Sequence, residues 1–183
     1  MRASALFAAL ALAALWSCSA WLWPALPARI PMHFDFGGRP DRWVERTPFQ
    51  WFLLPAIGTG MGLLFALALP AWIRRLAAKD SAYLNVPEKR AFARLAPEAR
   101  VRAVLPMMVL LRVIAAEVAL LFAGILIGSA RVAAGASSGL PPALLWTAVL
   151  ALPATALCSI PFGHASVRRE LERARSASAP RDR

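Results

Sequence analysis

Charged residues are scarce in this sequence, at 17% of 183 positions, whereas hydrophobic residues make up 59%. A single water-soluble core of this size cannot bury so much apolar surface, so lipid must cover part of it. Acidic residues are the scarcer sign of charge, with 10 Asp and Glu against 21 Lys and Arg. The basic residues lie between long apolar runs rather than along one amphipathic face, which argues against nucleic-acid binding.

Cysteine, histidine and catalytic motifs are also nearly absent. The two cysteines, Cys18 and Cys158, both lie inside apolar stretches, which leaves no disulfide framework and no paired-cysteine metal site. The sequence has no GxSxG, HExxH, GxGxxG or Walker pattern. We therefore expect no catalytic residues, no cofactor and no metal site.

Four apolar stretches are long enough to cross a bilayer, which takes about 20 residues. They cover residues 3–27, 48–73, 103–130 and 140–163. The sequence therefore predicts an all-α integral membrane protein, a four-transmembrane-helix bundle with a short ordered extracytoplasmic loop between helices 1 and 2. The predicted parts are a domain at 1–130, with a motif loop (27–43) and a basic cytoplasmic loop (74–102), a fourth helix at 131–163, and a basic, partly disordered tail at 164–183.

The first stretch could instead be a cleaved signal peptide, because Arg2 precedes a run of Ala and Leu, and small residues follow at 17–20. The uncharged stretch, however, continues through Trp21 and Trp23 to Ala28, which is longer than the apolar region of a signal peptide. Tryptophans at this position are typical of a membrane interface. We favour a retained helix.

The distribution of Lys and Arg predicts the orientation. Both termini and the loop between helices 2 and 3 hold 15 of these residues together, whereas the other two loops hold 5. Because basic loops stay in the cytoplasm, we expect a multi-pass protein of the cell (inner) membrane with both termini cytoplasmic. The two histidines, His33 and His164, would then lie on opposite sides of the membrane, and they could not share a metal ion.

Glycines suggest how the helices pack. The second apolar stretch contains Gly58 and Gly62, and the third contains Gly124 and Gly128, so each has a small-xxx-small spacing. Because this spacing lets backbones approach closely, we expect helices 2 and 3 to pair. The alternative is that glycine is simply common in membrane helices.

The basic loop is predicted to form short helices at the membrane surface. Asn85 can cap a helix with Pro87 and Glu88 in its first turn, and Phe92 and Leu95 would then face the bilayer. A second helix is expected to start at Pro97 and Glu98 and to run into the third span. We favour anchoring to anionic headgroups over recognition of a protein partner as the role of this loop.

The motif loop has the strongest local signals in the chain. Pro27 and Pro31 disfavour helix, Gly38 permits a tight turn, and Pro40 with Asp41 suggests a second turn. His33 and Asp35 form an H-x-D pair, but two ligands are too few for a structural zinc site. We expect His33 to hold the loop through a hydrogen bond to Asp35 or to the backbone.

This loop resembles a bacterial membrane family that carries the uncharacterised N-terminal domain of SdpI-type immunity proteins. The family pattern is L-P-x-x-I-P-x-H-F-x-x-x-G-x-P-D, and the chain matches it at Leu26, Pro27, Ile30, Pro31, His33, Phe34, Gly38, Pro40 and Asp41. A second family-like element, N-[IV]-P-x-K followed by an aromatic residue and a later Arg, is similar to Asn85, Val86, Pro87, Lys89, Phe92 and Arg100. The resemblance implies a helix, an ordered loop and a further helix, with sensing or immunity as the associated role.

Two charged residues inside the third apolar stretch are further candidates, because charge within a membrane helix is costly and often functional. Arg112 and Glu117 lie about 140° apart around a helix, so they are not each other's best partners. Arg112 can extend toward the cytoplasmic end, whereas Glu117 lies near the centre and is expected to face other helices. A polar contact that holds the bundle together is an equally good explanation.

Taken together, these residues predict a membrane protein that recognises a peptide, toxin or envelope component through its outer loop. A protein or peptide partner could bind that loop or the basic cytoplasmic face, and the sequence leaves the oligomeric state open. The main alternative is a small transporter or accessory subunit that uses Glu117 and Arg112. A purely structural membrane component is the third possibility.

Overall fold

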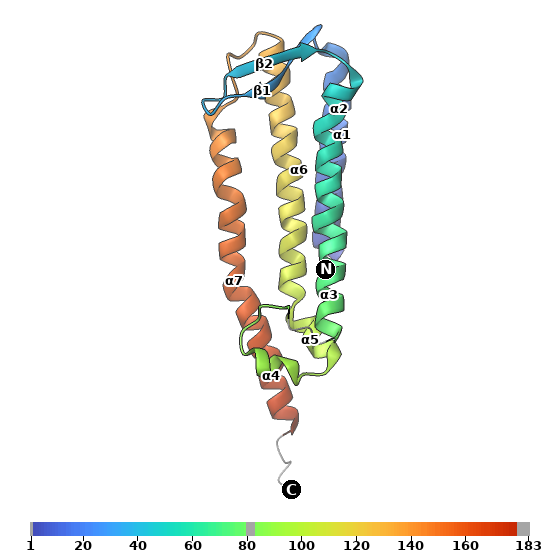
Figure 1. The fold of residues 1–183 in the computed structure, drawn as a ribbon, viewed down its shortest axis with the longest axis vertical. Coiled ribbons are helices and arrows are strands. Elements are labelled where there is room, and N and C mark those ends of the chain that lie inside the picture. Colours follow the sequence, from blue (N-terminus) through green and yellow to red (C-terminus); the bar gives the residue numbers. More distant parts are fainter. Residues whose placement is uncertain (1, 80–82, 179–183) are drawn as a thin grey trace.

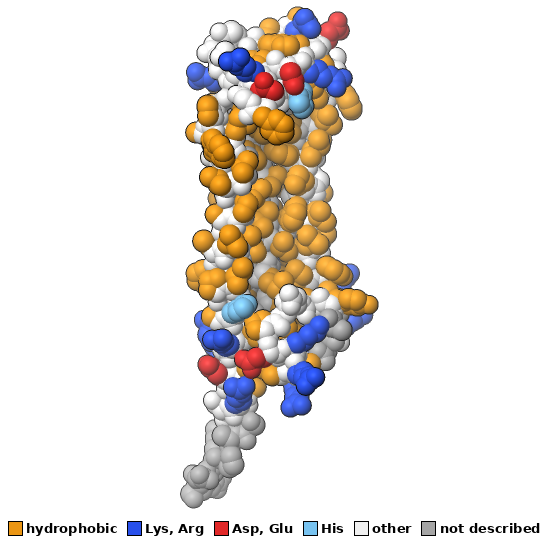
Figure 2. Space-filling view, turned by 60° about the vertical axis from the view of Figure 1, so that its left-hand side comes forward, with side chains coloured by type: hydrophobic (Ala, Val, Ile, Leu, Met, Phe, Trp, Pro, Cys, Tyr) orange, Lys and Arg blue, Asp and Glu red, His pale blue; other side chains and the backbone are white. Residues whose placement is uncertain are grey.

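A computed structural model describes residues 2–79 and 83–178, and it consists mostly of helices that run side by side (Figure 1). Four helical stretches are long and apolar enough to span a membrane, at Arg2–Ala25, Pro48–Lys79, Leu105–Ala133 and Pro142–Ala177. The predicted fold class is therefore confirmed. Charged side chains gather at the two ends of the molecule, and an apolar band separates them (Figure 2).

The elements follow one another in the order of the sequence. Helix α1 covers Arg2–Leu22 and ends in a short 3-10 turn, Trp23–Ala25; a β-hairpin follows. A continuous helical stretch follows, the α2 column. It comprises α2 (Pro48–Leu63), a π-helical segment (Leu64–Ala68) and α3 (Leu69–Lys79). The remaining helices are α4 (Lys89–Ala93), α5 (Pro97–Ala103), α6 (Leu105–Ala133) and α7 (Pro142–Ser178).

Helices α1, α2 and α6 pack into the main core. Small side chains line this core on both α1 and α6, which lets the two backbones approach closely. Leu15 of α1 is fully buried among them, and Trp51 of α2 is 3% exposed. The buried alanines of this core are Ala8, Ala11, Ala66, Ala115, Ala116, Ala119 and Ala123.

Glycines of α2 and α6 lie where other segments approach closely. A Cβ atom added at Gly58 or Gly62 would lie 2.7 Å from a leucine of α1, either Leu15 or Leu12. The corresponding atoms at Gly124 and Gly128 would lie 2.7 and 2.5 Å from Leu144 and Leu140. The predicted pairing of helices 2 and 3 is present, because α2 and α6 are in contact and a Cβ at Gly58 would also lie 3.2 Å from Phe122 of α6. The other three glycines accommodate leucines of other segments.

The π-helical segment has a cause in the sequence. Pro70 has no N–H group, so the carbonyl of Ala66 cannot form the ordinary hydrogen bond to the residue four positions later. A single turn with wider spacing accommodates such a defect, and the amide of Leu69 bonds instead to the carbonyl of Leu64.

The motif loop folds as an antiparallel hairpin of β1 (Arg29–Phe34) and β2 (Pro40–Glu45) that lies across one end of the bundle (Figure 1). The tight turn predicted at Gly38 is present, and this residue has a φ of +77°. The strands themselves were not predicted. Each strand contains a proline, and the burial of β1 alternates only in part, so the sequence lacks a clear period-2 pattern.

At the opposite end, α3, α4, α5 and the last part of α7 enclose a second apolar cluster. Phe92 and Leu95 are 2% and 6% exposed within it, so the prediction that they face the bilayer is wrong. The predicted Asn85 cap is also wrong, because α4 begins only at Lys89, after Glu88 in a left-handed conformation. Helix α5 does start at Pro97 with Glu98 in its first turn, and it is separated from α6 by Val104.

Helix α7 continues beyond the membrane-spanning length to Ser178. Residues 176–178 are therefore helical where the tail was predicted to be disordered, and positions 179–183 lie outside the described residues. Glu170 and Arg173 form an ion pair on this helix, at 2.5 Å.

Candidate functional site

The hairpin is attached to the bundle through the start of β1 and the residues that flank it. Ile30 is 1% exposed and Leu26 is 5% exposed, so both anchor the hairpin in the main core. Arg46 follows β2, and its backbone amide donates to the carbonyl of Ala28 at 2.8 Å. Its guanidinium donates to the Leu26 carbonyl and lies 5.0 Å from the ring centre of Trp23. These contacts fix the open end of the hairpin, where β1 begins and β2 ends, against the end of α1.

The turn of the hairpin is attached separately, to the loop between α6 and α7. The amide of Leu140 donates to the carbonyl of Gly38 at 2.8 Å. A Cβ atom at Gly139 would lie 2.6 Å from that same carbonyl oxygen, so only glycine allows this approach. The hairpin is therefore held both at its open end and at its turn.

The turn is closed by Asp35. Its side chain accepts a hydrogen bond from the amide of Arg39 at 2.8 Å, and its own amide donates to the carbonyl of Arg39 at 2.8 Å. His33 instead pairs with Asp41 across the hairpin, with 2.6 Å between Nδ1 and Oδ1. The expected partner of His33 was Asp35 or the backbone, and the structure corrects this to Asp41, because Asp35 turns back toward the turn backbone.

The matched motif residues divide by the direction they face. Ile30 and Pro31 are buried, and with Phe34 they line a cavity of about 270 Å³ between β1, α2 and α6. His33 and Asp41 face outward, with side chains 66% and 48% exposed. Of the other motif positions, Gly38 is buried at the contact with Leu140, Pro40 is half-buried and Pro27 is exposed.

Two aromatic residues of the hairpin region are exposed beside this pair. Phe36 lies at the turn and is completely exposed, and Trp43 of β2 is 37% exposed. Sequence reasoning did not select Phe36 as a candidate. A large apolar residue directly before Gly37 and Gly38 in a turn outside the predicted spans was the signal that could have found it.

The two charged residues inside the third span contact different helices. The Nε of Arg112 donates to the carbonyl of Ala66 at 3.3 Å, which is the carbonyl that Pro70 leaves without its usual partner. Glu117 accepts a hydrogen bond from the hydroxyl of Thr155 on α7 at 2.6 Å. The second carboxyl oxygen of Glu117 is buried and has no hydrogen-bond partner among the described residues.

The predicted cytoplasmic motif does not form a compact site within the described part of the chain. Asn85 is exposed in a stretch without regular structure, Pro87 is half-buried and Lys89 is exposed at the first position of α4. The later arginine of the same family-like element organises this end. Arg100 is 7% exposed and donates to the carbonyls of Ala78 and Ala93.

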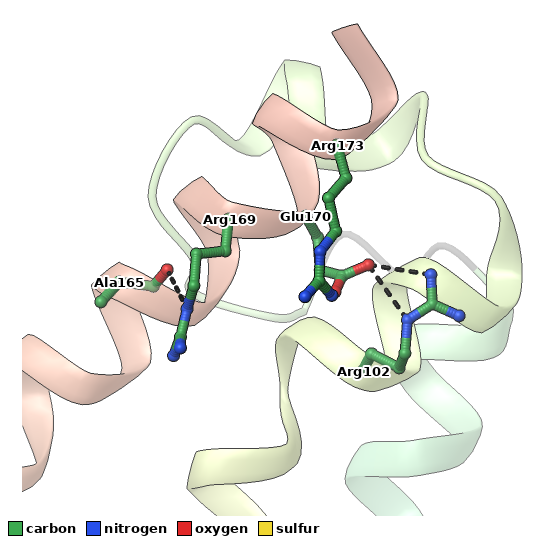
Figure 3. Close-up of polar contacts among 5 residues, drawn as sticks. All are labelled: Arg102, Ala165, Arg169, Glu170 and Arg173. Carbon is green, nitrogen blue, oxygen red and sulfur yellow. Dashed lines mark hydrogen bonds and ion pairs between the residues drawn. The ribbon is translucent and has the colours of Figure 1, made fainter. Parts of the chain in front are cut away.

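An ion cluster joins α7 to α5 at the same end (Figure 3). Glu170 is 4% exposed and contacts both Arg102, at 2.9 Å, and Arg173. Hydrogen bonding to Arg102, and then to Arg173, lowers the pKa of Glu170 although burial opposes the shift. No group of three or more metal-ligating side chains occurs among residues 2–79 and 83–178.

Comparison with known families matches residues 9–59 to a domain of unknown function, DUF1648. The matched segment runs from α1 through the hairpin into α2, so it includes every residue of the motif loop. No curated protein and no solved structure matches the chain. The chain is thus a multi-pass membrane protein that carries a domain of unknown function around the hairpin.

Proposed function

We propose that this protein is a non-enzymatic recognition protein of the cell membrane, which binds a peptide, toxin or envelope component on the outer surface of the hairpin. The observation that carries this proposal is the combination of firm attachment and exposure in one element. The hairpin is fixed at Leu26, Ile30 and Gly38, yet it presents Phe36 and the His33–Asp41 pair to the surroundings. A platform that is already ordered loses little conformational entropy when a ligand binds.

The exposed edge of β2 favours a peptide ligand. The sheet has two strands, so among the described residues no third strand covers β2. Since Arg46 bonds to Ala28, the alternation of an antiparallel ladder turns the backbone groups of Trp43 and Glu45 away from β1. An extended peptide can add to such an edge, and aromatic side chains near it are typical of binding hot spots.

The orientation with the hairpin outside the cytoplasm is part of this proposal and rests on the Lys and Arg distribution. It is tested with Phe36→Cys in a Cys18→Ala, Cys158→Ala background. A membrane-impermeant maleimide should label this cysteine from outside in intact cells. Labelling only from the cytoplasmic side would overturn the orientation.

The recognition role is tested in a deletion strain challenged with antimicrobial peptides, toxins and envelope-damaging agents. Phe36→Ala and Asp41→Ala should lose the protection that the wild-type protein restores. Phe49→Ala is the matched control, because Phe49 is 77% exposed at the start of α2 but lies outside the hairpin. Full protection by both hairpin variants at equal membrane levels would overturn the proposal.

A second candidate is a transporter or accessory subunit, and the unpartnered carboxyl oxygen of Glu117 favours it. Arg112 contributes less to this candidate than the sequence suggested, because its Nε donates to the carbonyl of Ala66 in the α2 column. The test is a proton or solute flux assay in vesicles with Glu117→Gln. Flux that is unchanged by this variant, or absent in the wild type, would exclude the candidate.

A further inference from the structure

An apolar groove lies between α6 and α7, on the half of these helices nearest to α5. It has a volume of about 730 Å³, and its lining includes Val109 and Val113 of α6 and Ala154, Cys158 and Phe162 of α7. From Leu105 to Val113 the lining spans about 12 Å at 1.5 Å per residue. Half of a bilayer's hydrocarbon core is about 15 Å thick, so the groove extends over most of one leaflet.

The groove is open to the side, where lipid surrounds the helices. Both walls belong to candidate membrane spans, and the apolar window of α7 has no buried residue. Cys158 and Phe162 are exposed at its edge. Because the hydrocarbon region holds no bulk water, an acyl chain is the ligand that this apolar space fits.

One basic residue, Arg169, lines the end of the groove toward α5. Its Nε donates to the carbonyl of Ala165 at 3.2 Å, which holds the side chain back along α7 (Figure 3). Arg102 and Arg173 of the neighbouring cluster share the carboxylate of Glu170. Among the described residues, in contrast, no carboxylate lies within ion-pair distance of Arg169.

From this combination of apolar groove and unneutralised guanidinium, we propose that the protein has a specific site for one anionic phospholipid of the leaflet nearest to α5. An acyl chain occupies the groove between α6 and α7. The phosphate of the headgroup binds the terminal nitrogens of Arg169, whose planar donors suit phosphate oxygens. The site is separate from the hairpin, which lies at the other end of the bundle (Figure 1).

The test uses the full-length protein in nanodiscs that contain phosphatidylcholine and a minor fraction of phosphatidylglycerol with a photoreactive acyl chain. Labelling should map to peptides that cover residues 105–113 and 154–162. Arg169→Gln should reduce the apparent affinity about fivefold, the contribution of one basic residue near an anionic surface. Arg168→Gln is the matched control, because this neighbouring arginine is equally exposed and does not line the groove.

A second pair of variants tests the groove itself. Ala154→Phe places a ring in the groove and should abolish the mapped labelling, whereas Ala143→Phe, at an exposed position of α7 outside it, should not. Water-soluble glycerol phosphate, which lacks acyl chains, should fail to compete. Labelling spread evenly over α1 and α2, equal effects of the two arginine variants, or competition by glycerol phosphate would overturn the proposal.

Discussion

Helices α1, α2 and α6 form a closely packed unit, whereas α7 is attached to one side of it. Leu15 and Ala116 of the three-helix unit are fully buried, while the apolar window of α7 has no buried residue. The difference cannot come from hydrophobicity, because all four spans have similar hydropathy, from 1.9 to 2.4. In lipid, close approach of small residues decides which helices pack tightly.

The attachment of α7 relies on a few specific contacts instead. The loop before it binds the hairpin turn through Leu140 and Gly38, and its final part binds α5 through Glu170. Between these ends, the hydrogen bond from Thr155 to Glu117 is the main polar contact with α6 among the described residues. Substitutions at matched positions in the two regions should therefore differ in a predictable order.

The largest effect is expected for Gly58→Val in the three-helix unit. The new Cβ would lie 2.7 Å from the buried Leu15, and overpacking of this kind costs about 2 kcal/mol. Gly124→Val makes an equally short contact, but with Leu144 of the more exposed α7, so we expect a smaller loss. The measurement is the free energy of unfolding in mixed micelles.

The control for both variants is Gly60→Val. No atom lies within 4 Å of a Cβ at Gly60, so the unfolding free energy should stay the same or rise. An equal loss at Gly58 and Gly124 would break the distinction between the two regions.

The next effect concerns the contact between Arg112 and Ala66. Arg112→Leu should cost about 1.5 kcal/mol, because it removes a charged donor from a carbonyl that Pro70 leaves without its usual partner. Pro70→Ala supplies that partner, so the double variant should lose less than Arg112→Leu alone. A double-mutant cycle of unfolding free energies measures this coupling, and strictly additive losses would contradict it.

The sequence was sufficient to predict the four spans, the turn at Gly38 and the start of α5, because these depend on local composition and on proline and glycine. It did not predict the strands, the Asp41 partner of His33 or the burial of Phe92. The strands and the His33–Asp41 pair belong to one local hairpin, whose alternating pattern is interrupted by Pro31 and Pro40. The burial of Phe92 depends on segments distant in the chain, because α3, α5 and α7 enclose the second apolar cluster. The local sequence around Phe92 could not show whether other helices or lipid would cover this side chain, since both are apolar.

The indole of Trp51 offers a smaller test of the three-helix unit. Its Nε1 donates to the carbonyl of Ser19 at 2.9 Å and is buried, so Trp51→Phe should cost about 1 kcal/mol. Trp146 of α7 is 63% exposed, and Trp146→Phe should leave stability unchanged. Unfolding in mixed micelles compares the two variants. A loss at Trp146 as large as that at Trp51 would mean that α7 is packed more closely than its exposure indicates.

The smallest effect is expected from Glu170, which holds the end of α7. Because the pKa of Glu170 is lowered below its ordinary value of 4.5, its contribution to stability is complete above pH 4.5 and is lost as pH falls further. The side chains of Arg102 and Arg173 are more than half exposed, so water screens these ion pairs. Protonation of Glu170 at low pH should therefore lower the melting temperature by only about 2 °C.

Glu170→Gln should remove this part of the pH dependence, whereas Glu172→Gln, at an exposed position of the same helix, should retain it. Melting temperatures of the three proteins between pH 7 and pH 3 provide the measurement. If Glu170→Gln also changed the unfolding of the three-helix unit, α7 and that unit would unfold together. The close packing of α1, α2 and α6 would then depend on α7 despite its exposed position.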